Sequence, residues 1–443
     1  VFRKQPCGIR AMRDGDTIVA LSSGAVPAGV AVIRLSGPAV PKILQVIAGG
    51  VPEPRCLTLR PIGTDAVLDR GLVAYFPSPH SFTGEDCAEL QVHGSPAGVR
   101  AILRLCTGLG ARLAEAGEFT RRAFENGKLD LVEIEGLGDL LDAETENQRR
   151  QAMARLDGGL TAQIDLWRDQ LLDLRAEIEA RLDFSDEGDV GDLPASFASD
   201  VDALEASIAA ALETVERGRV VRDGLRVALA GAPNAGKSSL LNALAKSEIA
   251  IVTDEPGTTR DVREVPIDIG GQLVIFLDLA GLRQTASKAE AEGVRRAQAE
   301  IERADLILWL TAPDVPDADW AKPLQVPVWR IATKADLGSL PQAHDLALST
   351  LKGDGLETLL QRLGDFAAER VGQGEPVLLS RERDRAALAA AVQALAATRT
   401  MLGDPELAAE SLRIASQALE RLVGRIDAER VLDRLFASFC IGK

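Results

Sequence analysis

The chain has 443 residues, of which 46% are hydrophobic and 26% charged, so about two to four globular domains are expected. Its formal net charge of −16 excludes a protein that coats nucleic acid over its whole surface, because phosphate binding needs clustered cations. No apolar run approaches the roughly 20 residues that span a bilayer, and no signal-peptide pattern is present, so a cytoplasmic protein without membrane contact is expected.

Residues 1–130 are expected to form an α+β domain. Short β-branched and apolar runs, such as Thr17 to Ala20 and Val30 to Leu35, alternate there with Gly and Pro turns. Such alternation is typical of strands joined by tight connections.

Residues 131–220 and 373–443 are expected to form an all-α domain. The first stretch is rich in Ala, Leu, Glu and Arg and has apolar residues three and four apart, for example Leu171, Leu174 and Ile178. Similar sequence returns after residue 372. The intervening unit is therefore expected to be an insertion whose ends lie close together, with the flanking helices packed as one bundle.

Two basic doublets, Arg121 with Arg122 and Arg149 with Arg150, are the densest in the first half of the chain. Such pairs are usually solvated helix faces. In an acidic chain, however, any RNA must meet a local basic patch. Both interpretations stay open.

Residues 221–372 are expected to form the inserted domain, an α/β domain with a mostly parallel sheet. Apolar runs of strand length alternate there with helical sequence. The predicted strands are Leu225 to Ala230, Leu273 to Leu277, Leu306 to Leu310, Val326 to Ile331 and Leu346 to Leu348.

A phosphate-binding motif, GxxxxGK[ST], follows the first of these strands at residues 231–238. Its glycines let the backbone wrap around phosphate, and the helix that starts near Lys237 adds its positive dipole end. Lys237 is expected to neutralise the β and γ phosphates, and the Ser238 hydroxyl to bind Mg²⁺. The predicted nucleotide contacts are Asn234, Ala235, Gly236, Lys237, Ser238 and Ser239.

Four further motifs follow in the order found in translation-factor-type GTPases, which gives a Ras-like P-loop G domain. This resemblance implies that Thr259 closes on Mg²⁺ and γ-phosphate, and that Asp278 holds Mg²⁺ through water. Asp336 is expected to accept hydrogen bonds from the guanine N1–H and 2-amino groups, which adenine lacks, so GTP is favoured over an adenine nucleotide. The predicted contacts in these motifs are Thr253, Thr258, Thr259, Asp278, Leu279, Ala280, Gly281, Thr333, Lys334, Asp336, Ser349, Thr350 and Leu351.

Two positions depart from the usual GTPase pattern. Thr333 stands where Asn is usual; it keeps a hydroxyl but loses an amide, so weaker guanine affinity with retained selectivity is expected. Leu282 stands where Ras-like proteins have a water-orienting Gln. Oxygens of Asn234 and of residues 253–259 could instead hold a monovalent cation near the β–γ bridge.

Motifs spread over nearly the whole chain resemble the MnmE family, also called TrmE, of tRNA-modifying GTPases. Within the G domain they are residues 231–242, 257–261 and 278–283. Outside it they are residues 81–86, residues 117–130 and the terminal Phe-Cys-Ile-Gly-Lys of residues 439–443.

The resemblance implies potassium-dependent GTP hydrolysis in a homodimer whose G domains meet across the nucleotide. It places K⁺ at Asn234, Thr253, the Glu255 carbonyl and Thr258. Catalysis would rest on Lys237, Thr259 and a water-positioning Glu290, with Glu292 as the near alternative.

The resemblance also implies that the N-terminal domain binds 5-formyltetrahydrofolate or a related folate. The matching residues are Arg34, Glu89, Lys128 and Lys443; a carboxylate suits the pterin donors, and cations suit the glutamate tail. Any of these taken singly is also an ordinary surface charge. Cys440 either reaches this pocket or is a structural thiol.

The resemblance implies an enzyme that, with the flavoprotein MnmG (GidA), adds an aminomethyl or carboxymethylaminomethyl group to C5 of the tRNA wobble uridine, U34. The chain has no GxGxxG fingerprint, so the flavin belongs to the partner. The alternative is an Era- or Der-type regulatory or ribosome-assembly GTPase without modification activity. Those proteins share the G motifs but not the N-terminal domain or the terminal motif.

Overall fold

The computed structural model describes residues 15–183, 193–247, 249–251, 263–278, 301–316, 326–338, 340, 343–372, 374–426, 431–432, 435–436, 439 and 442. By contacts the chain divides into two units, Val1–Glu135 with Val423–Lys443, and Gly136–Leu422. Within the described ranges, no helix is long and apolar enough to cross a membrane.

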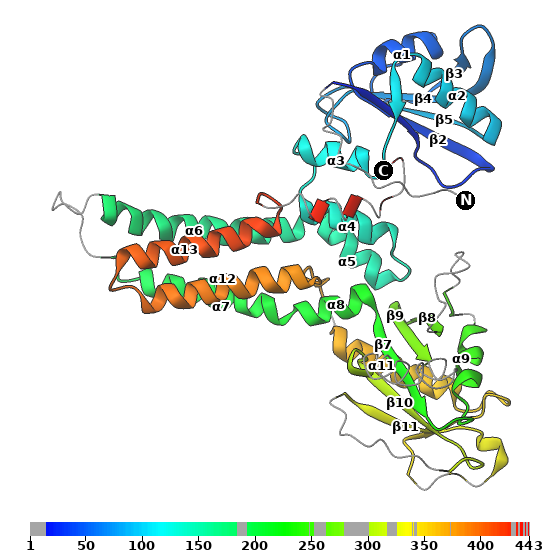
Figure 1. The fold of residues 1–443 in the computed structure, drawn as a ribbon, viewed down its shortest axis with the longest axis vertical. Helices are drawn as coiled ribbons and strands as arrows, with labels where there is room; N and C mark the ends of the chain where they lie inside the picture. The colour runs from blue at the N-terminus through cyan, green and yellow to red at the C-terminus, as the bar shows by residue number, and fades with distance from the viewer. Residues whose placement is uncertain are drawn as a thin grey trace, which may run out of the picture. The chain divides into compact units, whose positions relative to one another are not determined.

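A six-stranded sheet forms the centre of the first unit, with strand order β3-β4-β5-β2-β1-β6 (Figure 1). β1 and β6 are parallel, and the other neighbouring strands are antiparallel. The strands are β1 (Thr17–Leu21), β2 (Ala28–Ser36), β3 (Thr58–Gly63), β4 (Val67–Phe76), β5 (Cys87–Gly94) and β6 (Ala111–Leu113). The predicted α+β class is thereby confirmed for this domain.

The main core of this unit lies between one face of the sheet and two helices, α1 (Val40–Ile47) and α2 (Pro96–Gly108). Because side chains alternate along a strand, Ile33 and Leu35 enter this core while Arg34 between them faces the other side. The strand pattern thus leaves a charged residue on the second face of the sheet.

Helix α3 (Glu118–Glu125) and the C-terminal segment contribute to the second face. Phe119 of α3 packs with Ile18 and Ala20, which alternate with the core residue Val19. Phe436 is buried, and the Arg121 guanidinium lies 5.0 Å from the centre of its ring. The chain end therefore returns to the N-terminal domain.

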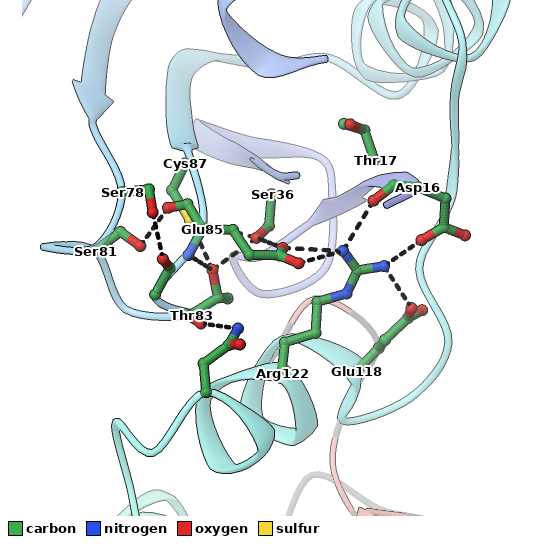
Figure 2. A network of polar contacts seen from close by, with 12 residues as sticks. Asp16, Thr17, Ser36, Ser78, Ser81, Thr83, Glu85, Cys87, Glu118 and Arg122 are labelled. Atoms are coloured by element: carbon green, nitrogen blue, oxygen red, sulfur yellow. Dashed lines mark hydrogen bonds and ion pairs between the residues drawn. The ribbon is translucent and has the colours of Figure 1, made fainter. Parts of the chain in front are cut away.

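A buried ion-pair network fixes α3 to the sheet and to the loop before β5 (Figure 2). Arg122, only 2% exposed, donates to the carboxylates of Asp16 at 2.6 Å, Glu85 at 2.9 Å and Glu118 at 3.2 Å. Burial alone raises the pKa of Glu118, but hydrogen bonds from Arg112 and the Glu115 amide hold that pKa below its usual value. Neither interpretation of the Arg121 and Arg122 doublet is right for Arg122, which is a structural residue.

Four helices of the second unit, α6, α7, α12 and α13, lie alongside one another and come from both sides of the G domain (Figure 1). In α6, residues such as Ile164, Leu171 and Ile178 are buried at helical spacing. The predicted bundle of flanking helices is present. These four helices are α6 (Gly159–Asp183), α7 (Phe197–Glu213), α12 (Glu382–Thr400) and α13 (Pro405–Leu422). The same unit contains α5 (Glu146–Leu156) and α8 (Val215–Asp223), and α4 (Leu131–Leu141) crosses the boundary between the two units in the sequence.

The G domain contains a second six-stranded sheet, with strand order β12-β11-β10-β7-β9-β8. Only the β8–β9 pair is antiparallel, so the predicted mostly parallel sheet is confirmed. Helices α9 (Lys237–Ala245) and α11 (Leu356–Val371) pack in its core cluster. The strands are β7 (Leu225–Gly231), β8 (Arg263–Ile269), β9 (Gln272–Asp278), β10 (Leu306–Thr311), β11 (Val328–Ala332) and β12 (Leu346–Ala347).

The two connections of the G domain lie against each other, as an insertion requires. The Arg217 side chain donates to the Val371 carbonyl at 2.9 Å. A Cβ added to Gly218 would lie 1.9 Å from the Leu379 carbonyl, so only glycine fits this approach. The boundaries at 130, 220 and 372 stay predictions, while contacts group residues 423–443 with the N-terminal unit instead of the helices.

Candidate nucleotide site and N-terminal site

The phosphate-binding loop joins β7 to α9, as predicted from the motif. Three of its residues have positive φ: Gly231 at 131°, Asn234 at 65° and Gly236 at 91°. Glycine adopts this conformation freely, and asparagine tolerates it better than most residues. The ammonium of Lys237 donates to the carbonyls of Gly231 at 2.9 Å and Ala232 at 2.7 Å, so it lies within the loop that phosphate would enter.

Two predicted magnesium residues from different motifs meet beside this loop. The Ser238 hydroxyl donates to the Asp278 carboxylate at 3.1 Å, and Asp278 at the end of β9 is 2% exposed. Hard oxygen donors of this kind suit Mg²⁺, which needs only one or two protein groups when phosphates complete its coordination. The donor set therefore fits the ion.

The predicted base-recognition residues also meet. Asp336 lies in a short 3₁₀ helix, Ala335–Leu337, and its carboxylate accepts a hydrogen bond of 2.6 Å from the buried Ser349 hydroxyl. This hydrogen bond lowers the pKa of Asp336. An ionised carboxylate is the acceptor that the two guanine donors require.

The other predicted residues of the two base-recognition segments, 333–336 and 349–351, lie in different environments. The Lys334 ammonium pairs with Asp314 at 2.7 Å. Leu351 is 84% exposed, and the contact with Asp336 comes from Ser349. Thr333 is 2% exposed, and its hydroxyl lies 2.8 Å from the Ala235 carbonyl of the phosphate-binding loop.

Several predicted residues lie outside the described residues, so the structure does not test their placement. They belong to the two segments between β7 and β10 and to the C-terminal motif. These residues are Thr253, Glu255, Thr258, Thr259, Leu279, Ala280, Gly281, Leu282, Glu290, Glu292, Cys440 and Lys443.

On the N-terminal domain, Arg34 and Glu89 face each other across β2 and β5. The Arg34 guanidinium donates to one Glu89 oxygen from Nε at 3.1 Å and from Nη2 at 2.8 Å. It also lies 5.3 Å from the ring centre of Phe82 and 5.9 Å from that of Phe119. The site therefore combines a carboxylate, a cation and aromatic surface.

The third folate candidate, Lys128, lies against the loop that carries Phe82. A Cβ added to Gly84 of this loop would come within 3.2 Å of the Lys128 Cε atom. Phe82 and Phe119 were not predicted as site residues, although both fall inside the motifs at 81–86 and 117–130. Their aromatic side chains, within those motifs, are the sequence feature that could have marked them as site residues.

Comparisons with known proteins match both units. The family of the MnmE helical domain matches residues 131–440, and the family of the GTP-binding protein TrmE N-terminus matches residues 17–128. The chain is 49% identical over 443 residues to the tRNA modification GTPase MnmE of Azorhizobium caulinodans, covering 97% of this chain and 100% of that protein. It is 50% identical over 439 residues to the protein of the same name from Methylorubrum populi, covering 97% and 98%.

Parts of the chain are similar to two solved structures. A variant of Aquifex aeolicus Era bound to GDP and aluminium fluoride is 27% identical, with a TM-score of 0.26, over 38% of this chain and 66% of that one. The G domain of the FeoB iron transporter from T. maritima is 24% identical, with a TM-score of 0.23, over 32% and 98%.

Proposed function

The chain belongs to the MnmE family of tRNA modification GTPases, and we propose that its GTP hydrolysis serves modification of C5 of the tRNA wobble uridine. The family match carries the tRNA part of this proposal, and the observation that carries its GTPase part is the contact of Ser238 with Asp278 and of Ser349 with Asp336. The first pair supports Mg²⁺ binding, and the second supports guanine selection.

We propose that different residues bind the phosphate end and the base end of the nucleotide. Lys237 and the loop amides bind the β and γ phosphates. Ser238 and Thr259 would hold Mg²⁺, with Asp278 contacting it through water, and the ion would neutralise phosphate charge. Asp336 accepts from the guanine N1–H and 2-amino groups. Selection of guanine over adenine follows from that acceptor.

Hydrolysis is proposed to depend on K⁺ and on a homodimer that brings two G domains together. Asn234, Thr253, the Glu255 carbonyl and Thr258 would hold the cation, which supplies positive charge near the β–γ bridge. The exposed turn at Asn234 supports this proposal because it lies at the tip of the phosphate-binding loop. Of the remaining catalytic candidates, Thr259 binds γ-phosphate, and Glu290 or Glu292 orients the water.

The N-terminal site is proposed to bind 5-formyltetrahydrofolate or a related folate as the one-carbon source. Glu89 suits the pterin donors, while Arg34, Lys128 and Lys443 suit the carboxylates of the glutamate tail. The pairing of Arg34 with Glu89 beside Phe82 supports this assignment. The flavoprotein MnmG (GidA) would supply the redox step on the tRNA.

The potassium proposal is tested by GTP turnover of the full chain in potassium and in sodium buffers. We expect turnover to fall strongly in sodium while GDP affinity stays nearly constant, because the cation acts on the transition state. Asn234→Ala should remove the difference between the two salts. Equal turnover of the unchanged chain in both salts would refute the cation role, and absence of GTP turnover in either salt would refute the GTPase proposal itself.

A further inference from the structure

Thr333 joins three segments of the G domain that are far apart in the sequence. It follows β11, and its hydroxyl lies 2.8 Å from the Ala235 carbonyl and 3.0 Å from the Thr311 carbonyl at the end of β10. Its side chain is 2% exposed. The contact with Ala235 links the base-recognition loop directly to the phosphate-binding loop.

The carbonyls of Ala235 and Thr311 both lie beside this hydroxyl but accept hydrogen bonds from different donors. The backbone N–H of Thr333 already donates to the Thr311 carbonyl at 2.8 Å. A threonine hydroxyl has one proton to donate, whereas an asparagine amide has two. Because Thr311 has the backbone donor, the single hydroxyl proton is available to Ala235.

The backbone at Ala235 is a place where such a hydrogen bond matters. Ala235 lies between Asn234 at φ 65° and Gly236 at φ 91°, so the chain is left-handed on both sides of it. A non-glycine residue in this region costs conformational energy that its surroundings must offset. Gly236 also packs closely on Thr333, because an added Cβ would lie 3.2 Å from the Thr333 hydroxyl.

We propose that Thr333 is a positioning residue for the phosphate-binding loop, and that base selection is left to Asp336. Thr333 then acts on nucleotide affinity by keeping the Ala235 peptide in the orientation that phosphate needs before the nucleotide arrives. This inference rests on the proposed binding of guanine nucleotide. It predicts that the phosphate end, and not the base end, senses the hydroxyl.

The test compares Thr333→Val with the unchanged full chain by calorimetric titration of GDP and of IDP, which lacks the 2-amino group, in the presence of Mg²⁺. We expect both affinities to fall by about tenfold, the size typical of removing the donor to a buried carbonyl, with the GDP to IDP ratio preserved. Thr333→Ser keeps the hydroxyl and should stay within about threefold of the unchanged chain.

Thr398→Val is the matched control. Thr398 is also fully buried and its hydroxyl donates to the Ala394 carbonyl at 3.0 Å, but it lies in α12 of the helical domain. Thr398→Val should leave GDP affinity unchanged, even if it lowers the melting temperature of the chain as much as Thr333→Val does. Unchanged affinity of Thr333→Val, or a loss confined to GDP, would overturn the inference. If the unchanged chain bound neither nucleotide, the proposed function would fail and the inference with it.

Discussion

Among single residues, Ser349 controls how Asp336 is presented to a base. Its hydroxyl is buried and donates to one oxygen of the half-buried Asp336 carboxylate. The hydrogen bond favours the ionised form and fixes its orientation. Asp336 therefore stays an acceptor across the physiological pH range.

Replacing Ser349 by Ala should weaken GDP binding several-fold at neutral pH and make it more sensitive to acid. Because Ser349 lowers the pKa of Asp336 from 3.8, the ionised acceptor persists above that value in the unchanged chain and is lost only as pH falls through the lower, folded value. Without the hydroxyl the pKa rises, so affinity should begin to fall at a higher pH. Titrations of GDP from neutral pH to below pH 3.8, where the carboxyl protonates, measure this.

Ser416→Ala is the control for this change, since its buried hydroxyl bonds a helix carbonyl at 3.1 Å in α13, in the helical domain. It should match the unchanged chain at every pH. Identical pH profiles for Ser349→Ala and the unchanged chain would show that the hydroxyl does not act on Asp336.

Sequence motifs predict residue roles well where the chemistry is local, and poorly where partners are distant. The P-loop spacing predicts that a helix starts near Lys237, and Lys237 and Ser238 are the first two residues of α9, because loop and helix are contiguous in the sequence. The burial of Arg122 was not predictable, since its partners Asp16 and Glu85 lie 106 and 37 residues away in the sequence. Nothing in a basic doublet distinguishes a surface pair from such a network.

Among the elements, α5 holds both connections of the G domain. Its buried face carries Gln148, Gln151 and Arg155, three and four residues apart. Gln148 donates to the Arg222 carbonyl at 2.8 Å on the entering side, and Gln151 to the Val377 carbonyl at 2.7 Å on the leaving side. One helix face thus fixes the junction between the G domain and the helical bundle.

Arg155→Met should lower the free energy of unfolding by about 3–5 kcal/mol, because it removes the buried cation of the Asp384 carboxylate and leaves Arg383, at 3.9 Å, as its cation. Both side chains of this pair are 0% exposed, and their charged atoms are 3.3 Å apart. Urea unfolding of the full chain, followed by tryptophan fluorescence, measures the change.

Arg149→Met on the same helix is the matched control. Its ion pair with Glu146 is more than half exposed, at 53% and 58%, and should contribute within about 1 kcal/mol. Equal effects of the two substitutions on the free energy of unfolding would mean that the buried face of α5 does not fix the junction between the G domain and the helical bundle.

Most core strands of the G domain and its edge strand β12 could be predicted, whereas the other edge strand, β8, could not. β7, β9 and β10 are buried apolar runs, which composition alone reveals. β8 lies at the edge of the sheet, where Arg, Glu, Pro and Asp interrupt the apolar residues. The sequence feature that best indicates β8 is Gly270-Gly271, the turn that joins β8 to β9 in a hairpin.

Across the whole molecule, the C-terminal segment stabilises the N-terminal domain. A Cβ added to Gly117 would lie 2.9 Å from Phe436, and the Ser22 hydroxyl donates to the Gly442 carbonyl at 2.8 Å. These contacts place Gly442 beside the end of β1. The sequence predicted that the helical domain continues to the end of the chain, because helical periodicity cannot show which unit a helix packs against.

Phe436→Ala should destabilise the N-terminal unit by about 3–5 kcal/mol, the cost of truncating a buried aromatic side chain. Hydrogen exchange read by mass spectrometry should show faster exchange in α3 and β1, with the G domain unchanged. Leu407→Ala, at a side chain that is 49% exposed, is the control and should leave exchange in α3 unaltered. Unchanged exchange of α3 in Phe436→Ala would disprove this role of the C-terminal segment.

We propose that this GTPase serves modification of the tRNA wobble uridine. The most direct test of this proposal is liquid chromatography with mass spectrometry of wobble uridines from cells that contain the chain, lack it, or carry Lys237→Ala. We expect aminomethyl and carboxymethylaminomethyl uridines to disappear without the chain, to fall sharply with Lys237→Ala and to return with the unchanged gene. Normal levels of both modified uridines in cells lacking the chain would contradict the proposal.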